Sequence, residues 1–328
     1  MPLIPFEAQG FSQLPHYGRM YASMPMLQWA AVTVGVSAIS ASTGSRPLAE
    51  LSWRSALMDA SLEQSGNRWL KTDAYVRLDA SEKSAVSYFL GMAQAQLSSD
   101  LLLGVPSLVH IDTYLRTIGQ SVRKSRPDFL GYDPRLRHAI VLEAKGRTHG
   151  YTDALVAYAK NQASKLPSLN GAATTAEIAS VAWFDADRVW HALLVDPPRR
   201  RQVTMHPAFA VLAAHYVPVV RAAIATRSVE DDGERVWFEV RAVDLTVSLP
   251  SPIFHAVRNE DRDEREPWSE RALSDAGHTI ADLIRQNTAA SEISLQPNFA
   301  EQVGSSTEYH GGDLIGIHLG DSWMDRLR

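Results

Sequence analysis

The sequence predicts an α/β fold in which a mixed sheet is flanked by helices, and three observations support this. Of the 328 residues, 45% are hydrophobic and 21% are charged, which is the composition of an ordinary globular protein. Along the chain, the apolar positions alternate between the 3.6-residue period of helices and the two-residue period of strands. Through the middle of the chain, these patterns follow the order helix, strand, strand, strand, helix, strand.

Residues 1–78 are predicted to form an N-terminal elaboration of this fold. The first 25 residues contain Pro2, Pro5, Pro15 and Pro25, which favour an extended arm over a helix. Three further elements are predicted: a strand rich in β-branched residues over 26–36, a helix over 46–64 and a strand over 69–78.

Residues 79–198 contain the clearest patterns. A helix is predicted to begin after Asp79 and to extend to about Leu97, with an apolar stripe formed by Val86, Phe89, Leu90 and Ala93. The elements expected after it are strands over 107–114, 127–131 and 139–146, a helix over 152–166, and strands over 178–184 and 189–195. The residues Tyr132-Asp133-Pro134 supply a turn between the second and third of these strands.

Residues 199–328 are predicted to form a C-terminal elaboration packed on the same core. The expected elements are a helix over 206–226, a strand or hairpin over 235–249, a helix over 269–287 and a terminal strand that includes 314–317. Pro218 is expected to kink or break the first of these helices, because proline lacks the amide hydrogen that a helix interior requires.

Several classes of protein are excluded by what the sequence lacks. It contains no cysteine, so disulfides, zinc–thiolate sites, iron–sulfur clusters and cysteine nucleophiles are excluded. It has neither a GxxxxGK[ST] phosphate loop nor a GxSxG nucleophile elbow. The histidines at 110, 138, 149 and 191 lack metal-ligand spacing. No signal peptide is found, and the apolar stretch over 26–39 is too short and polar to span a bilayer, so we expect a cytoplasmic protein without a membrane partner.

Charge is distributed unevenly along the chain. The net charge is −5, which gives no overall sign of a nucleic-acid-binding protein. Residues 121–165 nevertheless carry nine basic and four acidic side chains, whereas residues 228–270 carry twelve acidic and five basic ones. A basic middle could bind phosphates locally, although scattered solvated charge would give the same counts.

Two short segments carry the candidate chemistry: Arg126-Pro127-Asp128-Phe129-Leu130 and Leu142-Glu143-Ala144-Lys145-Gly146-Arg147. Because side chains alternate along a strand, Glu143 and Lys145 should share one face, and Ile140 and Leu142 the other. If the two segments pair as an antiparallel hairpin, Asp128 meets Glu143. The sheet would then supply two carboxylates, the carbonyl oxygen of Ala144 and a nearby ammonium, which suit a hard cation and phosphodiester hydrolysis.

Pro127-Asp128 together with Glu143-Ala144-Lys145 resembles the PD-(D/E)xK nuclease superfamily, which includes restriction endonucleases, junction resolvases and repair nucleases. The resemblance covers about residues 79–198, and it implies a restriction-endonuclease-like αβββαβ core. It also implies that Asp128 and Glu143 bind Mg²⁺, with Mn²⁺ as a substitute, and that Lys145 helps to activate water. Members often carry a glutamate on the preceding helix and a glutamine on the following one, which are Glu82 and Gln162 in this sequence.

The residues around this centre have alternative interpretations. Glu82 lies on the inward stripe with Val86 and is expected to bind the metal, but Asp79-Ala80-Ser81-Glu82 also fits a helix-capping box. Gln162 could bind phosphate or water, or lie at the edge of an apolar stripe. Nucleic-acid contacts are expected from Arg126, Arg147, Lys160 and Lys165, although the two arginines could equally be solvated strand ends. A contact of Arg199-Arg200-Arg201 with DNA is weighed against a solvated loop.

The sequence therefore predicts a metal-dependent phosphodiesterase that hydrolyses nucleic acid, with DNA favoured over RNA and endonuclease over exonuclease action. A bacterial restriction or defence role follows from the resemblance alone. A homodimer or a partner protein is compatible with the prediction, because cutting both strands needs two sites. The alternatives are a catalytically silent nuclease-fold module that binds nucleic acid or acts as a scaffold, and an enzyme acting on a different phosphate.

Overall fold

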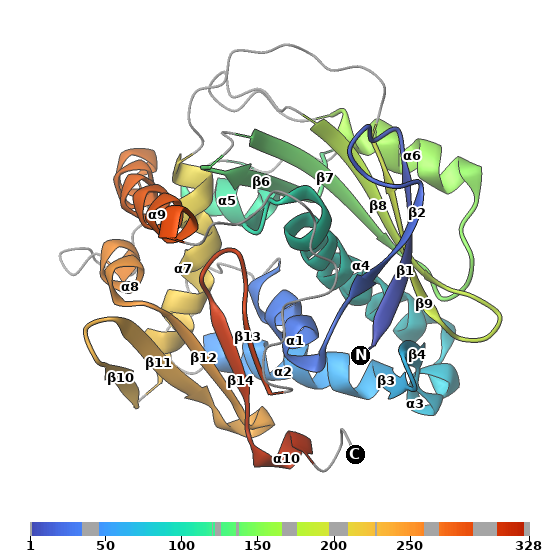
Figure 1. Ribbon diagram of the computed structural model, residues 1–328, viewed down its shortest axis with the longest axis horizontal. Helices are drawn as coiled ribbons and strands as arrows, with labels where there is room; N and C mark the ends of the chain where they lie inside the picture. Colours follow the sequence, from blue (N-terminus) through green and yellow to red (C-terminus); the bar gives the residue numbers. More distant parts are fainter. Residues whose placement is uncertain are drawn as a thin grey trace.

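A mixed sheet and a smaller antiparallel sheet form the framework of the protein (Figure 1). The computed structural model describes residues 2–34, 46–119, 121, 126–135, 138–165, 176–196, 209–226, 228–258, 269–290 and 307–324. Within these residues the mixed sheet has nine strands and the antiparallel sheet has five. The predicted α/β fold with a mixed sheet flanked by helices is therefore confirmed at this level.

The mixed sheet has the strand order β3-β4-β1-β9-β8-β7-β6-β5, and β2 pairs with β1 beside it. The strands are β1 (Leu3–Gln9), β2 (Tyr17–Tyr21), β3 (Leu62–Ser65), β4 (Arg68–Lys71), β5 (Leu108–His110), β6 (Phe129–Asp133), β7 (His138–Gly146), β8 (Ala176–Phe184) and β9 (Trp190–Val195). The strands β6 and β7 pair antiparallel, whereas β7 and β8 pair parallel. Strands at the centre of this sheet are apolar on both faces, because helices cover both.

Helices lie on opposite faces of the mixed sheet (Figure 1). On one face, α4 (Ala80–Leu103) packs so closely on β7 that a Cβ atom at Gly146 would lie 1.6 Å from the Ser87 carbonyl oxygen. On the other face, α6 (Asp153–Ala163) packs Ala159 against Ala179 and Val181 of β8. The remaining helices before β8 are α1 (Met24–Thr33), α2 (Arg46–Ser61), α3 (Asp73–Arg77) and α5 (Ile111–Thr117).

The antiparallel sheet has the order β10-β11-β12-β14-β13. Its strands are β10 (Val229–Asp231), β11 (Arg235–Val240), β12 (Leu245–Pro250), β13 (Glu308–His310) and β14 (Gly316–Leu319). The helices of this part are α7 (Phe209–Ala225), α8 (Ser251–Arg258), α9 (Glu270–Ala290) and α10 (Asp321–Met324), with a 3-10 turn at Arg241–Val243. None of the helices in the described part of the chain is long and apolar enough to cross a membrane.

A buried polar network attaches this second sheet to α1 and α7. The Asp313 carboxylate, fully buried, accepts hydrogen bonds from Trp29 Nε1 at 3.0 Å and contacts His215 Nε2 at 2.7 Å. His215 Nδ1 lies 2.8 Å from the Leu108 carbonyl oxygen at the start of β5. A single cluster of buried apolar residues extends through the N-terminal, middle and C-terminal parts of the chain. The three parts therefore share one core.

Most of the predicted elements of the middle region are present. Strands β6, β7, β8 and β9 and helices α4 and α6 lie where the sequence predicts them, and the expected order is interrupted only by α5. That helix and β5 together replace the strand predicted over 107–114. In the C-terminal region α7 continues through Pro218, and β11 and β12 form the expected hairpin.

The N-terminal predictions were less accurate. The strand predicted over 26–36 is wrong, because residues 24–33 form α1. The expected arm over the first 25 residues is instead part of the mixed sheet, where β1 pairs parallel with β9 and antiparallel with β2. The strand predicted over 69–78 is divided between the short β4 and α3. All residues of α1 are buried, so it has no polar face and no helical periodicity to detect.

Candidate active site

The hairpin of β6 and β7 brings two carboxylates together at one end of the mixed sheet. Phe129 pairs with Leu142, so the next position outward places Asp128 opposite Glu143. The Asp128 amide donates to Glu143 Oε2 at 3.0 Å, and the Ala144 amide donates to Asp128 Oδ2 at 2.9 Å. Before the first residue of β6, the two carboxylates thus accept hydrogen bonds from backbone amides of the opposite strand, as carbonyl oxygens do within the sheet. The antiparallel pairing on which the meeting of Asp128 and Glu143 depended is present.

Lys145 lies on the same face of β7 as Glu143. Its ammonium forms an ion pair with Glu143 Oε1 and lies 5.6 Å from the centre of the Tyr158 ring on α6. Glu143 and Lys145 pair with Ala179 and Val181 of β8, which pack under α6. Both side chains therefore point to the α6 face of the sheet, as strand alternation requires.

Burial shapes the electrostatics of the carboxylate pair. The Glu143 side chain is 1% exposed. Burial raises the pKa of Glu143 to about 7, and the Asp128 charge adds to this rise, while Lys145 opposes it. Burial also raises the pKa of Asp128, against the effect of the Ala144 amide and of Lys145. The metal-free pair is therefore inclined to retain a proton, because two buried like charges repel each other.

The raised pKa of Glu143 predicts a specific dependence of stability on pH in the metal-free protein. The pKa of Glu143 rises from 4.5 to about 7 on folding, so the folded state prefers the protonated carboxyl. The protein is therefore most stable with respect to this group below pH 4.5 and loses that stability as the pH rises through 7. Glutamine removes the charge and, with its single acceptor oxygen, keeps one of the two hydrogen bonds that Glu143 accepts from the Asp128 amide and Lys145. We expect Glu143→Gln to raise the free energy of unfolding above pH 7 by about 2 kcal/mol, and by progressively less toward acid pH.

Urea denaturation of both proteins in EDTA, repeated across this pH range, measures the effect. A difference between Glu143→Gln and wild type that stays constant with pH would contradict a raised carboxyl pKa. Addition of Mg²⁺ provides the control, because a bound cation removes the cost of the second charge in the wild type only.

The carbonyl oxygen of Ala144 faces the same edge as Asp128. The amide of Arg147 donates to the Ala182 carbonyl of β8 at 2.8 Å, so alternate residues of this segment, including Glu143 and Lys145, direct their backbone groups to β8. Ala144 is out of phase with them, and its amide reaches Asp128 on the other side. In an antiparallel pair both backbone groups of a residue point the same way, so the Ala144 carbonyl can act as a third oxygen ligand.

Gln162 is partly buried on α6, and its Oε1 atom accepts no hydrogen bond from the described residues. Because α6 connects two parallel strands, it runs antiparallel to β7. The four residues from Tyr158 to Gln162 advance about 6 Å along the helix, close to the roughly 6.6 Å between Lys145 and Glu143 on the strand. With Tyr158 beside Lys145, Gln162 lies at about the level of Glu143. Leu155 and Ala159 pack in the apolar cluster under α6, as the stripe predicted.

The prediction that Glu82 faces inward rather than to solvent is wrong. Glu82 is exposed, and its Oε2 atom accepts a hydrogen bond from the Asp79 amide at 3.1 Å. Asp79 Oδ1 accepts in return from the Glu82 amide at 3.0 Å, which completes the capping box. Ser87, which lies against Gly146 of β7, is the first buried residue of α4, and the turn that contains Glu82 is exposed. The periodicity predicted the correct stripe but not where along it the sheet begins.

The four basic residues expected at the nucleic-acid interface differ in their surroundings. Arg126 forms an ion pair with Asp112 at the start of α5. Arg147 and Lys165 are exposed, and Lys160 is partly buried in the last turn of α6. Arg199, Arg200 and Arg201 lie outside the described residues. Contacts of these side chains with nucleic acid stay predictions.

The donor set at this site fits magnesium better than zinc. Among the described residues, no group of three or more histidine, aspartate or glutamate side chains could hold a metal. Asp128 and Glu143 supply two carboxylates, and Ala144 supplies a carbonyl oxygen. Magnesium commonly takes one or two carboxylates and keeps several waters, whereas zinc sites need three or four protein ligands. The unpartnered oxygen of Gln162 could accept a hydrogen bond from such a water.

Two tyrosines border the site and were not predicted from the sequence. Tyr88, on α4, interacts electrostatically with Asp128 and Glu143, and burial together with the Asp128 charge raises its pKa to about 12. Tyr158 covers the Lys145 ammonium from α6. Tyr158 lies four residues before Gln162 on the same helix, so the two share a face, and this spacing could have indicated that Tyr158 also faces the site. For Tyr88 the sequence offers no comparable signal.

Comparisons of the chain with known protein families, with characterised proteins and with solved structures found no match. The chemistry of this site is therefore inferred from its own residues: two buried carboxylates that meet across a hairpin, an adjacent ammonium, and a free amide oxygen on the covering helix.

Proposed function

We propose that this protein is a divalent-metal-dependent nuclease of the PD-(D/E)xK type, which hydrolyses phosphodiester bonds of nucleic acid. The observation that supports the proposal most strongly is the convergence of Asp128, Glu143 and Lys145. Two adjacent carboxylates with raised pKa values retain a proton unless a cation compensates their charge, and a single lysine offsets only part of it. DNA is the substrate to test first.

Each residue of the site has a proposed role. Asp128, Glu143 and the Ala144 carbonyl would hold Mg²⁺ or Mn²⁺, and such a cation neutralises phosphate charge and acidifies water. Lys145 holds its ammonium beside Glu143, where it can donate hydrogen bonds to a phosphate oxygen or to the attacking water. The free Oε1 atom of Gln162 can accept a hydrogen bond from that water and so orient it.

Closed circular DNA, both duplex and single-stranded, tests the proposal together with the Asp128→Asn variant. We expect the wild type to open the circles with Mg²⁺ or Mn²⁺ and not with EDTA, because circles offer no ends to an exonuclease. We expect Asp128→Asn to cleave DNA at least about 100-fold more slowly than the wild type, because the asparagine is a weaker ligand for the cation. Calorimetry with Mn²⁺ should show weaker binding by the variant. A wild type that neither binds the metal nor cuts either circle would overturn the proposal.

One observation favours the alternative of a nucleic-acid-binding module without catalysis. In the described part of the chain no third carboxylate joins Asp128 and Glu143, since Glu82 caps its own helix. A silent module would bind DNA with the same affinity in Mg²⁺ and in EDTA and would leave both circles intact. The cleavage experiment therefore separates the two functions directly.

A further inference from the structure

Two exposed aromatic side chains border the Asp128–Glu143 site, a third lies farther out along the same series of rings, and the proposed hydrolysis uses none of them. Among the described residues, large hydrophobic side chains are exposed at only six positions. Three of these, Trp53, Tyr88 and Tyr158, are 45%, 40% and 57% exposed, and we call them the aromatic rim. Single exposed aromatics are ordinary on protein surfaces, but their concentration around one site is not.

The rim approaches the site from two sides. Tyr88 is on α4, and its amide nitrogen would lie 3.1 Å from a Cβ atom at Gly146, the residue after Lys145 on β7. Tyr88 also interacts with the charges of both Asp128 and Glu143. Tyr158 is on α6 and lies over the Lys145 ammonium, 5.6 Å from the ring centre. Because α4 and α6 cover opposite faces of the mixed sheet (Figure 1), the two tyrosines come from helices on different faces.

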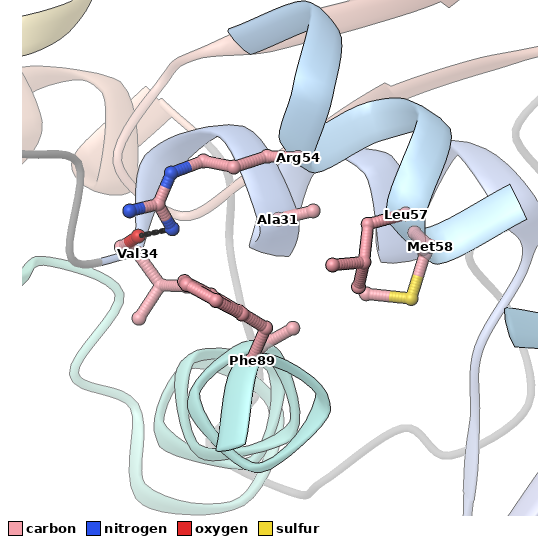
Figure 2. A pocket seen from close by; sticks show the side chains of 7 residues that line it. Ala31, Val34, Arg54, Leu57, Met58 and Phe89 are labelled. Carbon is pink, nitrogen blue, oxygen red and sulfur yellow. Dashed lines mark hydrogen bonds between the residues drawn. The ribbon is translucent and has the colours of Figure 1, made fainter. Parts of the chain in front are cut away.

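The outer part of the rim is held in place by buried contacts. The Phe89 ring lies 4.4 Å from the Trp53 ring and 5.4 Å from the Tyr88 ring, so the three rings form a continuous series. Figure 2 shows the Arg54 guanidinium above Phe89, with a 2.9 Å hydrogen bond to the Val34 carbonyl. Arg54 lies 5.5 Å from the Phe89 ring centre and also interacts electrostatically with Tyr88. Rings fixed in this way lose little freedom when a ligand stacks on them.

A cation lies next to the rim as well. Arg147 follows Lys145 by two residues, is exposed, and has a side chain that contacts no charged group in the described residues. A phosphate backbone crossing the site could therefore contact Arg147 while its bases meet aromatic rings. Aromatic rings interleaved with cations are the arrangement by which proteins bind single strands without sequence preference.

We propose that the substrate of this site is an unpaired nucleic-acid strand, whose bases stack on Tyr88 and Tyr158 as its backbone crosses the carboxylate pair. The inference rests on the proposed nuclease function, and it adds the class of substrate. In a duplex the faces of the bases are covered by their neighbours and cannot meet a side chain. In a single strand, a loop or a flap they are free to stack.

Binding measured by fluorescence anisotropy tests this without any cleavage. The probes are labelled oligothymidine, labelled oligouridine and a DNA duplex of equal length, with the full-length protein in Ca²⁺. We expect at least one single strand to bind about 10-fold more tightly than the duplex, and Tyr88→Ala and Tyr158→Ala each to weaken that binding about 10-fold. The phenylalanine variants should bind like wild type, because the ring remains. Tyr17→Ala is the matched control, since Tyr17 is 69% exposed on β2, and β1, β9 and β8 separate it from β7.

The outcomes separate this inference from the proposed function. Equal affinity for strand and duplex, or alanine variants of both tyrosines that bind oligothymidine and oligouridine like wild type, would overturn the inference, even if the protein cuts DNA in a Lys145-dependent way. Conversely, ring-dependent binding of a single strand supports it, even if the same protein cleaves no DNA and the nuclease function is rejected. Thermal melts of each variant verify that the fold is intact.

Discussion

Replacing Lys145 with methionine is expected to lower the rate constant kcat for DNA cleavage by about 100- to 1,000-fold, the usual cost of removing one preorganised charge from a transition state. Methionine has a similar length and can retain the packing against Tyr158. Lys145→Arg keeps the charge but not the compact ammonium, so we expect it to restore only part of the rate.

The same variant separates a catalytic role from a structural one. Lys145 forms an ion pair with Glu143, which is also a proposed metal ligand. Removing a positive charge beside a cation site should leave Mn²⁺ binding unchanged or tighter, whereas a merely structural lysine would affect binding and cleavage together. Calorimetry and single-turnover cleavage measure the two effects. The control is Glu82→Gln, which removes an exposed charge and keeps an oxygen that can cap α4. Cleavage by Lys145→Met at the wild-type rate would contradict the assignment.

The centre of the site could be predicted because it depends on local geometry. Strand alternation alone places Glu143 and Lys145 on one face, and a short turn is enough to bring Asp128 opposite Glu143. None of these relations needs information about distant parts of the chain. The antiparallel register and the carboxylate contacts agree with the prediction for this reason.

The outer parts of the site depend on tertiary packing and could not be predicted as well. An apolar stripe predicts which face of a helix is buried. The helical period does not predict how far the helix extends past the sheet on which it packs. Glu82 lies on the predicted stripe and is nevertheless exposed, because burial of α4 begins only at Ser87, which lies against Gly146 of β7. Tyr88 is adjacent to that contact, and only the crossing of helix and strand brings it to the carboxylates.

The N-terminal part illustrates a second limit. Periodicity identifies elements with one apolar face, and α1 has no polar face because every residue in it is buried. The partner of β1 is β9, which lies about 190 residues later in the chain, and no local pattern indicates such a pairing. The sequence therefore predicted an arm where the structure has a strand inside the mixed sheet.

Replacing Gly146 with alanine is expected to destabilise the protein by about 4 kcal/mol or more, which is a large part of the total stability of a typical domain. A Cβ atom at this position would lie 1.6 Å from the carbonyl oxygen and 2.3 Å from the carbonyl carbon of Ser87. Both atoms belong to the backbone of α4, so no side-chain rotation relieves the overlap. The helix would have to move away from β7. Because α1 contacts α4, this movement would also disturb the packing of α1 in the core.

Two other glycines provide graded controls for this prediction. At Gly91 a Cβ atom would lie 2.7 Å from the Gly146 amide nitrogen, a milder overlap, and alanine would recover about 1 kcal/mol of helix propensity. At Gly150 a Cβ atom would meet nothing within 4 Å, so we expect Gly150→Ala to stay within about 0.5 kcal/mol of wild type. Urea denaturation followed by circular dichroism should rank Gly146→Ala as the least stable variant, then Gly91→Ala, then Gly150→Ala.

The ranking also bears on the site. If Gly146→Ala were as stable as Gly150→Ala, α4 could not lie against β7 as described, and Tyr88 would lose its position beside Asp128 and Glu143. The carboxylate contacts would survive that result, because they are made within the hairpin of β6 and β7 and do not involve α4. A Gly146→Ala protein that still folds should therefore lose the discrimination between single strand and duplex before it loses metal binding.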